Sequence, residues 1–185
     1  MVLLTQKHAL VIGGTGMLSA VSLWLAKMGY KVSVIGRSKQ KHHELVKHAD
    51  NPTLINSLCL DYNNHSILEN EVKNAIQLNG PISLVISWLP SMQLLDTVNR
   101  LVSQYIDDWK LYQVKGSRRY FIVDLLNVPQ NCAHSSIYLG FILEGNQSRW
   151  LTNAEMADGV IKSVQDERTE SIIGTLHPYE KRPSY

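Results

Sequence analysis

The sequence is poor in the features that mark secreted, membrane-bound and nucleic-acid-binding proteins. Its only two cysteines, Cys59 and Cys132, lack a metal-type spacing, which predicts a reducing, cytoplasmic setting and no disulfide framework. The run MVLLTQK is too short for the apolar part of a signal peptide, and no run approaches the ~18 apolar residues of a membrane span. A net charge of +2 without a basic run argues against a nucleic-acid surface. We therefore expect a protein of the cytoplasm that engages neither nucleic acid nor membrane.

What is present is typical of one globular domain. The 185 residues are 44% hydrophobic and 18% charged, and apolar runs alternate with helical periodicities. We predict an α/β fold, namely a Rossmann-type doubly wound, mainly parallel sheet in a single domain over residues 1–185, with a truncated C-terminal part. The expected strands are 8–13, 31–36, 53–61, 82–89, 119–126 and 171–177, with a further apolar run at 137–143. The expected helices are 17–28, 38–49, 66–78, 90–106 and 152–166.

The last third of the chain departs from the alternation. Only ten residues, 127–136, separate the expected strand at 119–126 from the apolar run at 137–143. A parallel crossover with its own helix needs about a dozen residues or more, so we expect a loop or a bent extension there. Thr152 and Glu155 form a capping box that begins the last helix. The polar tail at 178–185 could fold over a site, pair with another subunit or stay frayed.

A glycine-rich turn follows the first strand and precedes the first helix, in the stretch VIGGTGMLSAV. A strand before, a helix after and a unit of about 30 residues are the context in which such a turn binds a dinucleotide. Gly13 allows the tight turn, Gly16 lets a pyrophosphate approach the helix N-terminus, and the Thr15 hydroxyl can donate to a phosphate. Ser19 takes the third glycine position, where helix and strand pack closely. The alternative is an ordinary β-turn-α unit.

Residues 8–38 resemble the N-terminus of the short-chain dehydrogenase/reductase superfamily, most closely its extended and atypical branches with a Gly-x-x-Gly-x-x-Gly turn. The resemblance implies that this turn binds a nicotinamide dinucleotide, through Gly13, Thr15, Gly16, Met17 and Leu18. It also implies that the residues after the third strand, Asp61 and Tyr62, border the adenine. Those after the fourth strand, Ser87, Trp88 and Leu89, then run under the ribose towards the nicotinamide.

The end of the second strand predicts which dinucleotide is bound. An acidic side chain there would bind the ribose hydroxyls of NAD, but the sequence has Gly36-Arg37-Ser38-Lys39. The guanidinium of Arg37 suits a 2′-phosphate and can stack on adenine, Ser38 adds a hydroxyl, and Lys39 or Lys41 adds charge. The sequence therefore favours NADP(H) over NAD(H). The alternative is that Arg37 merely begins a solvated helix.

The catalytic half of the superfamily's signature is missing. The resemblance implies a tyrosine with a lysine four residues later, and no Tyr-x-x-x-Lys occurs; Tyr112 and Lys115 are three apart. A proton donor would have to come from the same sheet edge. The candidates are Ser87, Asp124 and His134, followed by Tyr138. For His134 the alternative is a polar loop residue, and for Asp124 a turn cap.

Three functions remain open on the sequence. The first is an atypical short-chain dehydrogenase-like oxidoreductase that transfers hydride from NADP(H) to a small-molecule substrate. The second is a non-catalytic NADP(H) sensor resembling the NmrA-like proteins, and the third is a scaffold that binds no dinucleotide. His42, His43 and His48 are spaced by five and six residues, which does not suit a metal site on one helix face. The sequence leaves a homo-oligomer open.

Overall fold

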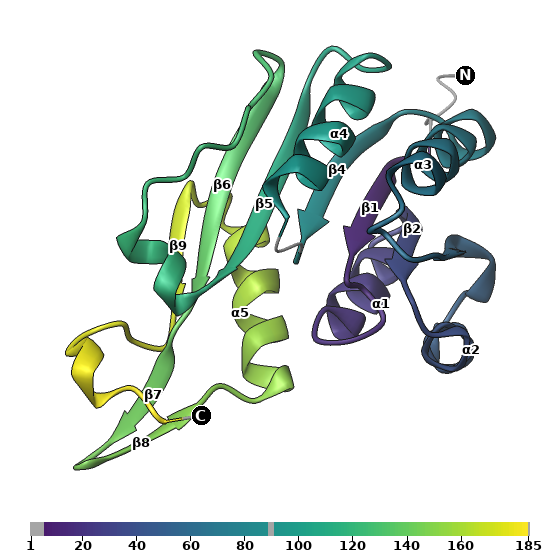
Figure 1. Ribbon diagram of the computed structural model, residues 1–185. Helices are drawn as coiled ribbons and strands as arrows, with labels where there is room; N and C mark the ends of the chain where they lie inside the picture. Colours follow the sequence, from purple (N-terminus) through teal and green to yellow (C-terminus); the bar gives the residue numbers. More distant parts are fainter. Residues whose placement is uncertain (1–5, 89–90, 185) are drawn as a thin grey trace.

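A single parallel sheet organises the chain, of which the computed structural model describes residues 6–88 and 91–184 (Figure 1). Seven strands within these ranges form it in the order β3-β2-β1-β4-β5-β6-β9, with every neighbouring pair parallel. They are β1 (His8–Ile12), β2 (Lys31–Gly36), β3 (Ile55–Cys59), β4 (Ile82–Ser87), β5 (Trp109–Gly116), β6 (Cys132–Leu139) and β9 (Glu170–Ile173). The prediction of a Rossmann-type, mainly parallel sheet is confirmed.

Helices cover both faces of the sheet. They are α1 (Ser19–Lys27), α2 (Lys39–His48), α3 (His65–Asn79), α4 (Met92–Ser103) and α5 (Asn153–Gln165), with short 3-10 turns η1 (Pro52–Leu54), η2 (Ser117–Phe121) and η3 (Tyr179–Lys181). α1 packs against α5 on one face, and α3 packs against α4 on the other. Side chains of Ser38, Asn64, Ser91 and Thr152 cap four of these helices at their N-termini. No helix in the described part of the chain has the length and apolar character to cross a bilayer.

The core consists of two apolar clusters on opposite faces of the sheet. Every residue of β1 is buried, as expected for a central parallel strand that is covered on both sides. Alternate residues of β1 serve the two clusters, Val11 on the side of α1 and α5, and Leu10 on the side of α3 and α4. Two predicted positions, Leu89 and the helix start at Pro90, lie outside the described residues, as do residues 1–5 and Tyr185.

The fifth strand lies earlier in the chain than predicted. The expected strand at 119–126 was wrong: these residues form the end of η2 and an irregular segment, and β5 occupies Trp109–Gly116 instead. The apolar spacing of α4 continues into Tyr105 and Ile106, so the pattern extends the helix beyond its end at Ser103 and displaces the strand. Without a place in the sheet, four apolar side chains of the segment are more than half exposed, namely Phe121, Ile122, Val123 and Leu125.

The link between β5 and β6 contains no α-helix, but it comprises residues 117–131 and not the predicted 127–136, because β6 begins inside the predicted loop. Residues 117–131, all of them described, hold only η2 and irregular backbone. β6 begins at Cys132, five residues before the apolar run at 137–143 starts, because its first half is polar and pairs with β5. Consequently the face of β5 and β6 towards α4 carries polar side chains where a crossover helix would otherwise lie.

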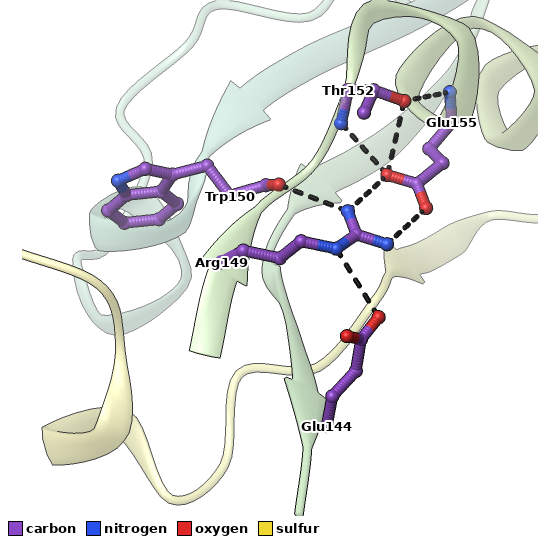
Figure 2. A network of polar contacts seen from close by, with 5 residues as sticks. All are labelled: Glu144, Arg149, Trp150, Thr152 and Glu155. Atoms are coloured by element: carbon purple, nitrogen blue, oxygen red, sulfur yellow. Dashed lines mark hydrogen bonds and ion pairs between the residues drawn. The ribbon is translucent and has the colours of Figure 1, made fainter. Parts of the chain in front are cut away.

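A two-stranded hairpin, β7 (Phe141–Glu144) and β8 (Gln147–Trp150), separates β6 from α5. Figure 2 shows the Arg149 guanidinium between two carboxylates, with both terminal nitrogens 2.9 Å from Glu155 and Nε 3.3 Å from Glu144. The predicted capping box of α5 is present, since Glu155 N–H donates to Thr152 Oγ1 and Thr152 N–H donates to Glu155. The hydrogen bonds from Arg149 and Thr152 lower the pKa of Glu155 to about 2. One ion-pair network therefore fixes the hairpin to the start of α5.

A buried histidine joins three strands at the opposite, amino-terminal edge of the sheet. His8 is fully buried, with Nδ1 2.7 Å from the Gly80 carbonyl and Nε2 2.8 Å from Ser33 Oγ. Because a carbonyl only accepts, Nδ1 carries the proton, and Nε2 accepts from the Ser33 hydroxyl, which in turn accepts from Asn56 Nδ2 at 2.9 Å. Burial lowers the pKa of His8, which favours the neutral imidazole in which Nε2 accepts from Ser33.

Candidate functional site

The candidate site lies at the carboxyl ends of β1 and β4. The strand order reverses at this point, because the chain runs outward from β1 to β2 and β3 and then returns to β4 on the other side. In open parallel sheets such a switch point is where ligands bind. Residues 13–18 form an irregular turn there, between β1 and the first residue of α1, Ser19.

Two glycines of this turn are required by packing. Gly13 has a φ of +83°, and a Cβ added to it would lie 3.3 Å from Trp88 Cβ. A Cβ on Gly14 would lie 2.6 Å from Ser22 Oγ and 2.8 Å from a methyl of Val11. The Ser22 hydroxyl donates to the Gly14 carbonyl at 3.0 Å. The close approach of helix and strand that the sequence assigned to Ser19 therefore occurs at Gly14, whose side-chain position is the crowded one.

Gly16, in contrast, faces open space. It is exposed, and the nearest heavy atom to a Cβ at this position would be the Gly13 carbonyl oxygen at 3.9 Å. The backbone N–H groups of Met17 and Leu18 have no backbone hydrogen-bond partner among the described residues, as is usual in the first turn of a helix. The Leu18 side chain is fully buried, so this residue could contact a ligand only through its backbone. These groups fit a diphosphate, which needs close approach and free donors.

The side chain of Thr15 connects the turn to the end of β2. Its hydroxyl lies against Gly36, where a Cβ would come within 2.4 Å of Thr15 Oγ1. The next residue, Arg37, is exposed, and its guanidinium carbon lies 5.5 Å from the centre of the Tyr62 ring. This cation–π contact holds Arg37 beside the rim of the site, and no pairing of its guanidinium with a carboxylate occurs within the described chain.

Two other predicted binding residues have local partners. Ser38 is the N-cap of α2, and its hydroxyl accepts a hydrogen bond from Lys41 N–H at 3.3 Å. Asp61 is exposed after β3, and its carboxylate accepts from the backbone N–H of Asn63 at 3.1 Å and from the Asn63 side chain at 3.0 Å. Both lie near Arg37 along the edge of the sheet, and both are engaged in turns that fix the backbone.

Ser87 is the last residue of β4 and Trp88 follows it, and the two side chains differ in their exposure to solvent. Ser87 is fully buried, and within the described part of the chain its hydroxyl has no hydrogen-bond partner. Trp88 is 38% exposed and reaches from Gly13 towards β5, where its Cη2 atom would lie 4.0 Å from a Cβ on Gly116. The indole therefore forms a wall between the glycine turn and β5.

A pocket of about 180 Å³ adjoins this wall. Its lining combines apolar and cationic side chains: Trp88, Met92, Gln113, Val114, Lys115, Gly116 and Arg119. The two cations converge on one carboxylate, because Lys115 Nζ and Arg119 Nη2 both contact Asp124, the latter at 2.9 Å. Burial acts to raise the pKa of Asp124, but the hydrogen bonds and charges of Lys115 and Arg119 outweigh it and leave this pKa lowered.

Lys115, like Arg119, is a residue of the pocket that the sequence did not indicate. It is 4% exposed, it donates to Ser136 Oγ at 2.8 Å, and its ammonium lies 5.2 Å from the centre of the Tyr138 ring. Lys115 and Tyr138 are direct partners in the β5–β6 register, so the two strands bring together a lysine and a tyrosine that are far apart in sequence. The alternation of side chains in WKLYQVKG could have indicated this strand and the position of Lys115 on it. It was overlooked because the fifth strand was predicted at 119–126.

His134 lies on the same face of the sheet, further from the carboxyl end of β6. It pairs with Leu111, and its Nε2 lies 3.0 Å from Gln113 Oε1, so Nε2 donates to this carbonyl oxygen. Burial and the nearby charge of Lys115 lower the pKa of His134, against the opposing effect of Asp124. His134 and Asp124 thus share a face of the sheet but contact different partners. No group of three or more histidine, cysteine or acidic side chains in the described residues could hold a metal ion.

The arrangement is that of a Rossmann-type fold, and comparisons with known proteins show which solved structures share it. No protein-family model and no curated protein sequence matches the chain. Solved structures match, among them a short-chain dehydrogenase/reductase of the glucose/ribitol dehydrogenase type from Brucella melitensis, at 11% identity and a TM-score of 0.69. The alignment covers 90% of this chain and 93% of that one.

Two further neighbours belong to the same class. A β-ketoacyl-[ACP] reductase from Bacteroides thetaiotaomicron aligns with a TM-score of 0.67 at 14% identity, over 92% of this chain and 98% of its own. A short-chain dehydrogenase/reductase from Serratia marcescens aligns with a TM-score of 0.67 at 12% identity, over 91% and 96%. The fold of the chain is therefore that of the short-chain dehydrogenase/reductases, a group of oxidoreductases, as the residues 8–38 predicted.

Proposed function

We propose that the chain binds NADP(H) and acts as an atypical oxidoreductase that transfers hydride to a small-molecule substrate. The observation that carries the proposal is the continuity of the site. The Trp88 indole lies between the glycine turn, where it packs against Gly13, and the cationic pocket beside Lys115, which it lines. A dinucleotide whose diphosphate lies at the turn would extend past Trp88 to this pocket.

Each group of predicted cofactor residues would contact a different part of the dinucleotide. Gly13, Thr15, Gly16, Met17 and Leu18 would receive the diphosphate through backbone N–H groups and the space above Gly16. Arg37 and Ser38 would hold the 2′-phosphate, and Asp61 and Tyr62 would border the adenine, with Tyr62 already beneath the Arg37 guanidinium. An exposed arginine without a carboxylate partner in the described residues favours a phosphate over a free ribose hydroxyl.

When bound, NADPH supplies a hydride to an acceptor in the pocket. Lys115 would then be the best-placed proton donor, because its ammonium borders the pocket and is held there by Asp124 and Ser136. Asp124 itself holds Lys115 in position rather than donating, since its lowered pKa leaves it ionised at neutral pH. Ser87 and His134 stay predictions: the Ser87 hydroxyl is buried, and His134 Nε2 already donates to Gln113.

The cofactor preference is tested by the substitution Arg37→Asp. We expect NADPH affinity to fall by about tenfold or more, because a negative carboxylate replaces the guanidinium that would bind the negative 2′-phosphate. We expect NADH affinity to rise. Lys47→Asp is the matched control: it makes the same charge change at the far end of α2, roughly 13 Å along the helix. Equal effects of the two substitutions on NADPH would refute the role of Arg37.

Turnover is tested separately, by following NADPH oxidation with quinones, enones, carbonyl compounds and flavins as acceptors. Oxidation that depends on Lys115 would support the enzyme, and Lys115→Met should reduce kcat while NADPH binding persists. Tight NADPH binding without oxidation of any acceptor would instead favour the non-catalytic sensor.

A further inference from the structure

The pocket beside Trp88 has an uneven charge. It has two cationic lining residues, Lys115 and Arg119, and none of the lining residues that the structure describes is acidic. Asp124, which neutralises one of the two charges, reaches them from outside this lining. One positive charge therefore remains at a site whose other lining residues include the apolar Trp88 and Met92 and the neutral Gln113.

The side chains of Lys115 and Arg119 differ in how buried they are and in how firmly their contacts hold them. The Lys115 side chain is 3% exposed and is held by Asp124 and Ser136, so it is fixed in the sheet. The Arg119 side chain is 35% exposed, and its Nη2 also contacts Met92 Sδ at 3.4 Å on the pocket wall. Arg119 can therefore turn a free edge of its guanidinium towards a ligand, and a planar guanidinium binds a carboxylate with two parallel hydrogen bonds.

The resident carboxylate is carried by a weakly packed segment. The neighbours of Asp124 in the chain, Val123 and Leu125, are 83% and 86% exposed. The segment leaves η2 and runs without regular structure to β6 (Figure 1). The ion pairs of Asp124 attach it to the sheet, and further along Leu126 packs against the apolar core and the Asn127 N–H donates to Asp96 at 2.9 Å. A carboxylate from solution would meet the same two cations in the same place.

We propose that this pocket is a subsite for small carboxylates with an apolar body, that Arg119 binds the carboxylate group, and that Asp124 is its internal competitor. The apolar body of the ligand lies against Trp88 and Met92, and the segment that carries Asp124 yields or shifts when the ligand binds. The proposal deepens the proposed function, on which it rests for the role of the ligand as substrate, because the pocket is where the hydride acceptor would bind.

The test uses benzoate and its neutral analogue benzamide as probes of the full-length protein, with binding followed by tryptophan fluorescence. We expect benzoate to bind at least about tenfold more tightly than benzamide, and Arg119→Gln to remove this difference. Arg118→Gln is the matched control, because it removes the same charge from η2 at a residue that does not line the pocket. Equal affinities for benzoate and benzamide, or equal effects of the two arginine substitutions, would overturn the proposal.

A second variant acts in the opposite direction. Asp124→Asn removes the competing carboxylate with little change in shape, so benzoate should bind several-fold more tightly than to the unmodified protein; weaker or unchanged binding would count against competition. Inorganic phosphate that binds as well as benzoate would overturn the carboxylate class. A parallel titration with NADPH separates the two proposals, because carboxylate selectivity without NADPH binding refutes only the proposed function, and NADPH binding without carboxylate selectivity refutes only the subsite.

Discussion

Two single substitutions in the glycine turn, Gly16→Ala and Gly14→Ala, should separate the proposed binding role of the turn from its role in folding. The Gly16→Ala methyl group would meet nothing closer than the Gly13 carbonyl oxygen at 3.9 Å. The protein should therefore be as stable as before or more stable by about 0.4–1 kcal/mol, because alanine restricts the unfolded chain. If a diphosphate lies above Gly16, however, the methyl group occupies its space, and NADPH affinity should fall by about tenfold or more, which is ~1.4 kcal/mol.

Gly14→Ala is the matched control with the opposite result. Its methyl group would lie 2.6 Å from Ser22 Oγ and 2.8 Å from methyl groups of Val11 and Val34. These contacts are too short, and relieving them in a packed core costs about 1–3 kcal/mol. For a chain of this size that corresponds to a fall of roughly 3–10 °C in Tm.

The assay combines thermal unfolding by circular dichroism with a fluorescence titration at a temperature where both variants are folded. We expect Gly16→Ala to keep its Tm and lose NADPH, and Gly14→Ala to lose stability. If Gly16→Ala binds NADPH like the unmodified protein, the diphosphate does not lie at this turn and the reasoning fails.

Three further predictions concern thiols, pH and the hairpin. Exposed Cys59 should react quickly with a thiol reagent and Cys132 only after unfolding, because burial raises the pKa of Cys132 to about 12; two fast thiols would contradict this. Burial also lowers the pKa values of His8 and His134 below 6.5, so the unfolded chain binds protons more readily. The free energy of unfolding should thus decline as pH falls below about 6.5, by at most about 1.4 kcal/mol per pH unit for each histidine. Urea unfolding measured across this pH range would disprove the prediction if the free energy of unfolding did not change with pH. Arg149→Lys should lower Tm, because a lysine cannot form the paired hydrogen bonds that fix the hairpin to α5; an unchanged melting curve would contradict that role.

The sequence predicted the parts of the fold that depend on local signals. The glycine turn, the helix cap at Thr152 and the buried first strand each follow from a few adjacent residues, and all three are present. The fifth strand could not be placed in the same way. Apolar side chains at Tyr105 and Ile106 continue the spacing of α4, and the run at 119–126 has strong strand propensity but gains no place in the sheet.

The part of the candidate site around the glycine turn could be located from the sequence, whereas the pocket beside Trp88 could not. Gly16 and Arg37 belong to one continuous stretch whose meaning depends on local order. The contact of Lys115 with Asp124 depends instead on the β5–β6 register and on the path of a loop, neither of which is encoded locally. Asp124 was a candidate from the sequence, but its partner emerged only when the strands were placed.

The most direct test of the central claim is an equilibrium titration of the protein with NADPH and NADH, followed by energy transfer from tryptophan to the nicotinamide. Trp88 lies in the wall of the site, so Trp88→Phe should weaken the transfer signal more than Trp24→Phe. We predict saturable binding with NADPH preferred over NADH by about tenfold or more. If neither dinucleotide binds below millimolar concentration, the chain is not a nicotinamide-dependent oxidoreductase.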